Sequence, residues 1–198
     1  MAKKQQKLKA VEQKRLLKLD LGCGPNKREG FLGVDCRDFK GVDQVVDLAE
    51  LDPTGREHGI IAYKNWPWDN DSVEEVYTSH FVEHLTSEQR IHFVNELYRV
   101  LIPGGKCLLI TPHWASCRAY GDLTHKWPPV SEFWFYYLSK EWRAVNAPHN
   151  DGYACDFEVT WAYTMHPSLV SRNQEYQMQA LGFWKEAAQD TIATLTKR

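Results

Sequence analysis

A turn with two glycines follows the first apolar stretch of the chain. Residues 20–24 read Asp-Leu-Gly-Cys-Gly, so a carboxylate precedes Gly22 and Gly24, which are separated by one residue. Because glycine has no Cβ, such a turn lets the backbone approach a ligand closely. Asp35 ends the next apolar stretch, and its carboxylate can accept hydrogen bonds from ribose hydroxyls. Together these residues predict a site for a nucleoside-bearing cofactor.

Two other interpretations of the glycines have to be weighed. A lone Gly-x-Gly also occurs in an ordinary tight turn between a strand and a helix. Dinucleotide-binding domains carry Gly-x-Gly-x-x-Gly, which would need glycine at position 27, and the chain has Lys27 there. The sequence therefore disfavours the close packing of a pyrophosphate-binding helix.

A second group of residues could move protons. His113, Asp122 and His125 follow an apolar stretch that ends near position 111. A neutral imidazole is available at about pH 7, so His125 or His113 could accept a proton, and Asp122 could orient His125. Ordinary hydrogen bonding within a loop is an equally good explanation of these three residues.

These side chains need elements that position them. Apolar runs that alternate with turn signals predict strands over 16–21, 31–34, 44–48 and 73–79. Thr86 or Ser87 can cap a helix whose apolar residues recur at helical spacing, and Pro-Gly-Gly at 103–105 ends it. A strand over 106–111 completes the order that is expected of a parallel α/β sheet.

The rest of the chain is less regular. Residues 113–150 are aromatic and punctuated by proline, and we expect them to pack as a small cap, with an apolar lid or a base-stacking surface as the alternative. A strand is expected over 157–165, whereas 168–195 is mostly compatible with helix, interrupted near Gly182. Ligands bind beyond the carboxyl ends of parallel strands, so the turns after the strands are the expected site.

Five segments then match a known family in order. They are the glycine turn at 19–26, the second strand at 30–35, the segment at 46–48, the fourth strand with its exit at 69–85, and the helix with its following turn at 97–106. Together they resemble class I S-adenosylmethionine-dependent methyltransferases, in a compact variant similar to predicted bacterial and phage methyltransferases. Asn26 stands where the family often has a third glycine, and only ten residues separate Gly24 from Asp35, so the usual first helix must be very short or absent.

The resemblance implies S-adenosylmethionine as the cofactor and names the residues that would contact it. The implied contacts are Asp20, Gly22, Cys23, Gly24, Asp35, Cys36, Asp47, Leu48, Ser79 and His80. The backbone at Gly22 would meet the methionine part, Asp35 the ribose, and Asp47 or Leu48 the adenine. Ser79 and His80 would line the cofactor near the methyl-bearing sulfur.

Residues 80–84 also suggest a metal. They read His-Phe-Val-Glu-His, which matches the His-x-x-Glu-His signature of inverted zinc proteases, and two histidines four residues apart on a helix could share an ion. In the methyltransferase interpretation, Glu83 and His84 instead stabilise the turn into the next helix. We therefore expect no metal site.

Composition limits the remaining choices. The 198 residues are 43% hydrophobic, which suits one domain at 19–198 after a leader at 1–18. The leader holds seven bases and one acid, so it carries +6 and leaves −8 for the remainder of a chain whose net charge is −2. It could contact nucleic-acid phosphates, although a frayed, solvated segment is the simpler interpretation. Five cysteines without a close pair, no long apolar run and no signal-peptide core predict a cytoplasmic protein without a membrane contact.

The sequence therefore predicts a Rossmann-like α/β fold, in which a mainly parallel sheet is flanked by helices and an aromatic-rich cap follows the fifth strand. The expected function is methyl transfer from S-adenosylmethionine to a small-molecule acceptor, because 79–82 lacks the Asn/Asp-Pro-Pro-Tyr/Phe exit typical of amino-group DNA methylation. A non-catalytic S-adenosylmethionine-binding module or partner subunit, and a nucleic-acid methyltransferase guided by the leader, are the alternatives. The acceptor atom and the oligomeric state stay open.

Overall fold

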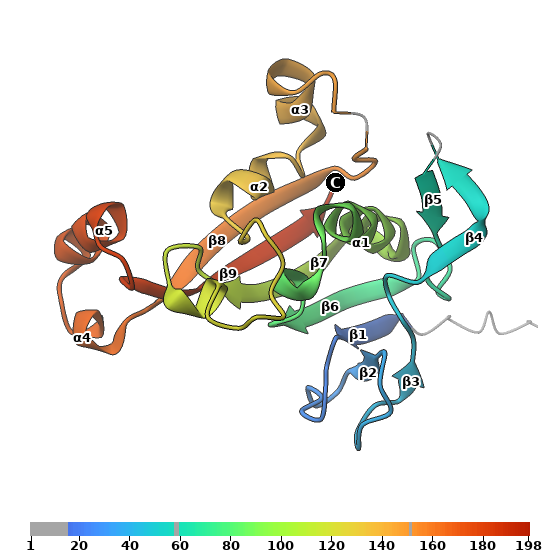
Figure 1. The fold of residues 1–198 in the computed structure, drawn as a ribbon, viewed down its shortest axis with the longest axis horizontal. Helices are drawn as coiled ribbons and strands as arrows, with labels where there is room; N and C mark the ends of the chain where they lie inside the picture. Colours follow the sequence, from blue (N-terminus) through green and yellow to red (C-terminus); the bar gives the residue numbers. More distant parts are fainter. Residues whose placement is uncertain (1–15, 58–59, 151) are drawn as a thin grey trace, which may run out of the picture.

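Seven strands form one sheet in the order β3-β2-β1-β6-β7-β9-β8 in a computed structural model that describes residues 16–57, 60–150 and 152–198 (Figure 1). The strands are β1 (Leu17–Leu21), β2 (Leu32–Asp35), β3 (Gln44–Val45), β6 (Val73–Ser79), β7 (Leu101–Pro112), β8 (Phe157–Met165) and β9 (Ala188–Lys197). Two further strands, β4 (Leu51–Glu57) and β5 (Ile60–Tyr63), pair with each other as a separate antiparallel hairpin.

The order of the parallel strands reverses at β1. The strands β3, β2, β1, β6 and β7 run parallel, whereas β9 is antiparallel to both β7 and β8. The chain adds β2 and β3 on one side of β1 and then crosses to β6 on its other side. In open α/β sheets, ligands bind outside the carboxyl ends of the strands at such a switch point. The fold therefore directs attention to the ends of β1, β2 and β6.

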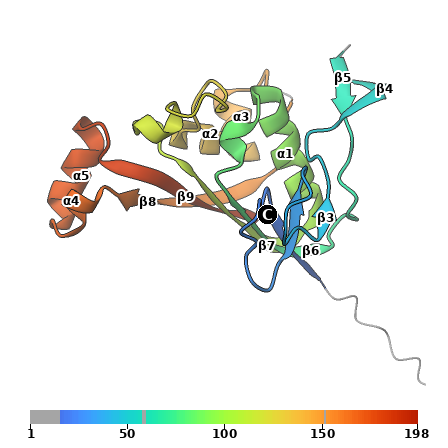
Figure 2. The same ribbon diagram turned by 60° about the horizontal axis from the view of Figure 1, so that its bottom comes forward.

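One long helix covers the centre of the sheet. Helix α1 (Ser87–Val100) begins with a capping box, in which Thr86 Oγ1 accepts the Gln89 N–H over 3.4 Å and Gln89 Oε1 accepts the Thr86 N–H over 2.9 Å. Figure 2 shows that α1, α2 (Glu132–Tyr136) and α3 (Lys140–Asn146) lie on the same side of the sheet. Fully buried side chains from the sheet and these helices form one core: Leu19, Leu21, Val76, Phe93, Leu97, Leu109, Phe135, Phe157 and Leu195.

The connection between β1 and β2 packs on the opposite face of β6. Tyr77 points away from its buried neighbours Val76 and Thr78, because successive side chains of a strand alternate. The Arg28 guanidinium lies 4.5 Å from the centre of the Tyr77 ring. The Phe31 ring packs edge-on against the same tyrosine ring, with the two ring centres 6.5 Å apart. This connection is therefore fixed to the sheet by side-chain packing rather than by a helix of its own.

Two short helices lie at the far end of β8 and β9. Both views place α4 (Pro167–Val170) and α5 (Gln174–Phe183) beyond the strand ends, away from α1 (Figures 1 and 2). Leu169 and Ala180 pack on Ala187 in a small separate apolar cluster. The chain then returns into the sheet as β9.

The predicted fold class is confirmed: a mostly parallel sheet is flanked by helices, and aromatic residues cluster after the fifth strand of the parallel region. The strands predicted at 73–79 and 157–165 have these bounds in the structure. As expected, no helix interrupts residues 22–31, all of which are described. The prediction that 168–195 is mostly helical was wrong beyond α5, because residues 188–195 belong to β9. The hairpin β4–β5 was not predicted.

One prediction falls mostly outside the described residues. Most of the basic leader, residues 1–15, lies outside them, and its last two residues, Leu17 and Lys18, already belong to β1. Within the part of the chain that the structure describes, no helix has both the length and the apolar character that a membrane crossing requires.

Candidate functional site

A cavity of about 570 Å³ opens at the ends of β1, β2 and β6. Seven of the ten residues predicted to contact a cofactor line it: Gly22, Gly24, Asp35, Cys36, Asp47, Leu48 and His80. Cavities of roughly 300–1,000 Å³ are typical of small-molecule and cofactor sites. The motifs that are separate in the sequence therefore meet around one volume.

The glycine turn forms one wall of this cavity, and its geometry requires glycine. Gly22 and Gly24 have φ angles of +70° and +52°, which side chains rarely tolerate. The N–H groups of Gly22 and Cys23 both donate to the Val34 carbonyl, over 2.9 and 3.1 Å, and so anchor the turn to β2. A Cβ added at Gly22 would lie 2.5 Å from the Phe81 ring, whereas one at Gly24 would meet nothing within 4 Å. Gly22 thus allows close packing, and Gly24 leaves its surroundings open for a ligand.

Two carboxylates also line the cavity. Asp35 Oδ2 accepts the Gly24 N–H over 3.0 Å, and its Oδ1 accepts the Arg37 N–H over 3.0 Å. Asp47 Oδ1 accepts the Ala49 N–H over 3.0 Å. Each carboxylate oxygen has two lone pairs, so both groups are oriented by the backbone and retain acceptor capacity for hydroxyl or amino groups of a ligand.

Three predicted cofactor residues do not line the cavity. Asp20 is almost fully buried, burial raises the pKa of its carboxyl group, and its Oδ2 accepts the Arg28 N–H over 2.7 Å. Burial also raises the pKa of the Cys23 thiol to about 11, so this thiol is a weak nucleophile. Ser79 ends β6 beside the lining residue His80. In the structure, Asp20 holds the connection between β1 and β2 in place.

His80 has an unusual backbone conformation at the end of β6. Its φ angle is +53°, in a region that non-glycine residues seldom occupy. Its Nδ1 lies 3.2 Å from Oε1 of Glu83, whose side chain is buried, and its Nε2 lies 3.9 Å from Oδ1 of Asp190. The hydrogen bond to Glu83 raises the pKa of His80, and the negative charge of Asp190 acts in the same direction, while burial partly opposes both. This imidazole is a titrating group in the wall of the cavity.

The residues predicted to handle protons lie in two different places. His125 Nε2 is 3.9 Å from Asp122 Oδ2, and its Nδ1 lies 3.0 Å from the Ala119 carbonyl oxygen. His113 is 5% exposed, with Nε2 3.1 Å from Glu132 Oε1 and Nδ1 3.2 Å from the Ala115 nitrogen. The structure thus brings Asp122 and His125 together and places His113 apart from them.

One cluster of side chains could hold a metal ion, and it differs from the pair His80 and His84 that the sequence suggested. Single ligand atoms of Glu83, His84 and His125 lie within 4.8 Å of one another. Tetrahedral zinc with bonds of about 2.0 Å would need its donors roughly 3.3 Å apart. Nδ1 of His84 is engaged by Thr124 Oγ1 at 3.0 Å. The three side chains would have to move inward to hold an ion.

Four further lining residues were not predicted to contact a cofactor. Thr124 and Lys126 reach the cofactor cavity from the irregular segment after β7, and Gln89 and His84 reach it from the region around the start of α1. Arg90 fixes this arrangement, because its buried guanidinium donates to carbonyl groups on both sides, including Val82 and Lys126. Only the tertiary fold brings these segments together.

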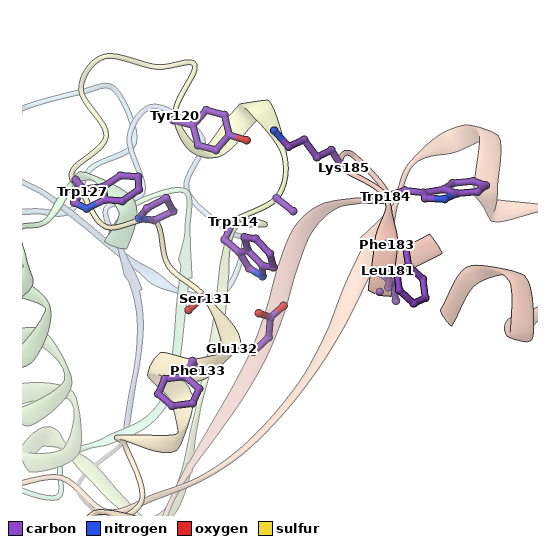
Figure 3. A pocket seen from close by; sticks show the side chains of 13 residues that line it. Trp114, Tyr120, Trp127, Ser131, Glu132, Phe133, Leu181, Phe183, Trp184 and Lys185 are labelled. Atoms are coloured by element: carbon purple, nitrogen blue, oxygen red, sulfur yellow. The ribbon is translucent and has the colours of Figure 1, made fainter. Parts of the chain in front are cut away.

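A second cavity, of about 770 Å³, is lined in part by the same irregular segment after β7 (Figure 3). Trp127 lines it, next in sequence to Lys126, which lines the first cavity. Figure 3 shows Trp114, Tyr120 and Trp127 on one side and Phe183, Trp184 and Lys185 on the other, with Glu132 between them. The walls are mainly apolar, six of the thirteen lining residues are aromatic, and one acidic and one basic side chain are included.

Comparison with known proteins identifies a family model and solved structures that are similar to this chain. Residues 19–109 match a family model described as a methyltransferase domain. A SAM-dependent methyltransferase from Archaeoglobus fulgidus superposes with a TM-score of 0.58 at 18% identity, covering 93% of this chain and 87% of that one. One from Methanosarcina mazei superposes with a TM-score of 0.52 at 15% identity, covering 93% of each chain.

A third similar structure contains ligands. The geranyl diphosphate C-methyltransferase of Streptomyces coelicolor, in complex with Mg²⁺, geranyl diphosphate and S-adenosyl-L-homocysteine, superposes with a TM-score of 0.50 at 14% identity, covering 93% of this chain and 71% of that one. No curated protein sequence matches the chain.

Proposed function

We propose that this chain transfers the methyl group of S-adenosylmethionine to a small-molecule acceptor, because residues 19–109 match a methyltransferase domain and the fold is similar to that of SAM-dependent methyltransferases. The observation that carries the proposal is the cavity in which Gly24, Asp35, Asp47 and His80 meet at the ends of β1, β2 and β6. It lies at the position that the topology favours for a ligand.

The residues of the cavity fit S-adenosylmethionine. The backbone at Gly22 and Gly24 would contact the methionine part, since nothing crowds the open side of Gly24. The free lone pairs of Asp35 would accept hydrogen bonds from the ribose hydroxyls, and Asp47 with Leu48 would flank the adenine. His80 would lie near the methyl-bearing sulfur.

The chemistry requires little of the protein beyond alignment. The bound sulfonium supplies a methyl group that is already activated for transfer. The task of this chain is to hold the acceptor nucleophile in line with the methyl group and to exclude competing water, and alignment of this kind supplies much of the acceleration of such reactions. The roles of His125, His113 and Asp122 in moving the acceptor proton stay predictions.

The aromatic cavity supports a small, flat or apolar acceptor. Its walls carry Trp114, Trp127 and Phe133, whose rings are from half to four-fifths exposed and available for stacking. Lys126 and Trp127 are neighbours in sequence and line different cavities, so one segment of the chain contributes to both. An acceptor bound among the aromatic rings would extend its nucleophile past this segment.

Calorimetry with S-adenosylmethionine, followed by transfer of a labelled methyl group, tests the proposal. We expect binding of one cofactor per chain and methylation of at least one member of a panel of small aromatic alcohols, amines and carbon nucleophiles. An absence of binding at millimolar cofactor would contradict the proposal. Binding without turnover across the panel would favour the non-catalytic module, and methylation of nucleic acid that requires residues 1–15 would favour the leader-guided alternative.

A further inference from the structure

Two carboxylates and one guanidinium act on the imidazole of His80. Glu83 lies on the 3₁₀ helix Val82–His84, Asp190 lies on β9, and Arg118 lies on the 3₁₀ helix Cys117–Ala119. Arg118 Nη1 is 3.0 Å from the Asp190 carboxylate, so this carboxylate already has a cationic partner. We propose that His80, oriented by Glu83, accepts the proton that the methyl acceptor loses; this inference rests on the proposed methyl transfer.

Glu83 is placed to fix one tautomer of His80. Its side chain is 3% exposed, and its Oε2 accepts a hydrogen bond from Thr111 Oγ1 over 3.3 Å. Its Oε1 faces Nδ1 of His80, and an ionised carboxylate can only accept. The proton of a neutral imidazole therefore sits on Nδ1, which leaves the lone pair of Nε2 free.

Nε2 of His80 has no partner at hydrogen-bond distance among the described residues. Asp190 Oδ1 is 3.9 Å away, which is too long for a hydrogen bond. Asp190 is 8% exposed and pairs with Arg118, so it contributes negative charge beside Nε2 rather than a contact to the acceptor. A hydroxyl or amino group of an acceptor in the cavity would find Nε2 of His80 as a proton-accepting nitrogen.

The backbone of His80 is consistent with a functional role. A φ angle of +53° is costly for a residue with a Cβ, and such strain persists only where surrounding contacts hold it. Here those contacts are the hydrogen bond to Glu83 and the N–H of His80, which donates to the Ile110 carbonyl over 2.9 Å. The strained turn keeps the half-exposed imidazole in the wall of the cofactor cavity.

The other histidines of this region are less suited to the task. Both ring nitrogens of His113 have partners at hydrogen-bond distance, Glu132 and the Ala115 backbone. His125 does not line the cofactor cavity. His84 does line it, but its Nδ1 pairs with a threonine hydroxyl rather than with a buried carboxylate. His80 combines a carboxylate partner with a position in the cavity wall.

The step conserves atoms and charge. A lone pair of the acceptor O–H or N–H group forms the bond to the methyl carbon while the carbon–sulfur bond breaks toward sulfur. The acceptor proton passes to Nε2 of His80, and the resulting imidazolium is stabilised by Glu83 and Asp190. The inference therefore assigns the acceptor to alcohols, phenols or amines, rather than to nucleophiles that carry no exchangeable proton.

Histidine-labelled protein provides a test that does not depend on the identity of the acceptor. Nitrogen-15 NMR of the full chain, with and without S-adenosylhomocysteine, would report the tautomer and the titration midpoint of His80. We expect the neutral ring to carry its proton on Nδ1, with a midpoint above the ordinary histidine value of about 6.5. Glu83→Gln should lower the midpoint, and Glu158→Gln, on the exposed face of β8, should leave it unchanged. A proton on Nε2 of the neutral ring, or the same His80 midpoint in Glu83→Gln as in the parent protein, would overturn the inference.

Methyl transfer to 2-naphthol, used as a phenol probe, extends the test to the reaction. We expect His80→Gln to lower kcat by about 100-fold or more and His149→Gln to have no effect. The rate of the parent protein should rise with pH through the His80 midpoint. Turnover by His80→Gln with the parent pH profile would overturn the inference and leave the methyltransferase proposal intact. Failure of the parent protein to bind S-adenosylmethionine would instead contradict that proposal, and the NMR result on the free protein would still decide the tautomer.

Discussion

The backbone N–H of Gly24 donates to Asp35 Oδ2 over 3.0 Å, so the residue that ends β2 holds the turn that follows β1. The same carboxylate is expected to meet the ribose of the cofactor. It therefore links the shape of the glycine turn to the occupancy of the site. Removing it should affect both at once.

Asp35→Ala should weaken binding of S-adenosylmethionine by about tenfold or more, because hydrogen bonds to a charged group contribute about 1.5–3 kcal/mol. Calorimetry measures the change. Asp38→Ala is the matched control, since Asp38 is exposed three residues further on and does not line the cavity. Equal affinities of the two variants would rule out the assigned role of Asp35.

Gly22→Ala should destabilise the fold by about 1–3 kcal/mol, because strained backbone and a forced contact are both costly. The new Cβ would lie 2.5 Å from the Phe81 ring at a φ angle of +70°. Chemical denaturation gives the free energy of unfolding. Gly182→Ala in α5 is the control: an added Cβ meets nothing within 4 Å, so stability should stay equal or rise by up to about 1 kcal/mol.

Arg90→Met should lower the free energy of unfolding by about 2–4 kcal/mol, since it leaves buried acceptors without donors. The guanidinium donates to the carbonyl groups of Val82, Glu83, Lys126 and Pro128. It thereby joins the exit of β6 to the segment that separates the two cavities. Arg172→Met, at an exposed position, should change stability by less than about 0.5 kcal/mol. Similar losses in both variants would contradict this assignment.

The stability difference between the parent protein and Glu83→Gln should depend on pH. Glu83 raises the pKa of His80 in the folded state, so the resulting stabilisation is fully present below the unfolded pKa of about 6.5 and is lost as pH rises through the folded pKa. The difference should therefore shrink as pH rises above about 6.5 and through the raised folded pKa of His80. Denaturation at several pH values measures it. A difference that stays constant or grows would show that the two side chains are not coupled.

Trp127→Ala should weaken binding of 2-naphthol and leave the affinity for S-adenosylhomocysteine unchanged. The reason is that Trp127 lines the aromatic cavity and does not line the cofactor cavity. We expect a loss of roughly tenfold, since stacking contributes about 1–3 kcal/mol. Val145→Ala is the control, because Val145 is a comparably exposed apolar side chain on α3, outside both cavities. Equal loss in the control would remove the aromatic cavity from the proposal.

The sequence contains enough local information for the parts of the fold whose pattern is local. The strand Val73–Ser79 and the Thr86 cap were predictable, because alternation and capping depend on neighbouring residues. The strand Ala188–Lys197 was not, because it contains good helix formers and becomes a strand between β7 and β8. There the pairing partners outweigh weak local preference.

The same distinction applies to the candidate site. Gly22, Gly24 and Asp35 were found because they belong to short motifs at strand ends. Asp190 lies more than a hundred residues from His80 and has no motif of its own. The pairing of His80 with Glu83 was visible only as part of a metal-like pattern, and the structure gives it a different interpretation. Long-range neighbours of this kind cannot be deduced without the fold.

The carboxylates beside His80 have a consequence for product inhibition. Glu83 and Asp190 both lie next to this imidazole, which forms part of the cavity wall. Their negative charges favour the sulfonium of the substrate, so the cavity should hold the charged cofactor more tightly than the neutral thioether left after transfer. The spent cofactor should therefore leave readily, and turnover should tolerate its accumulation.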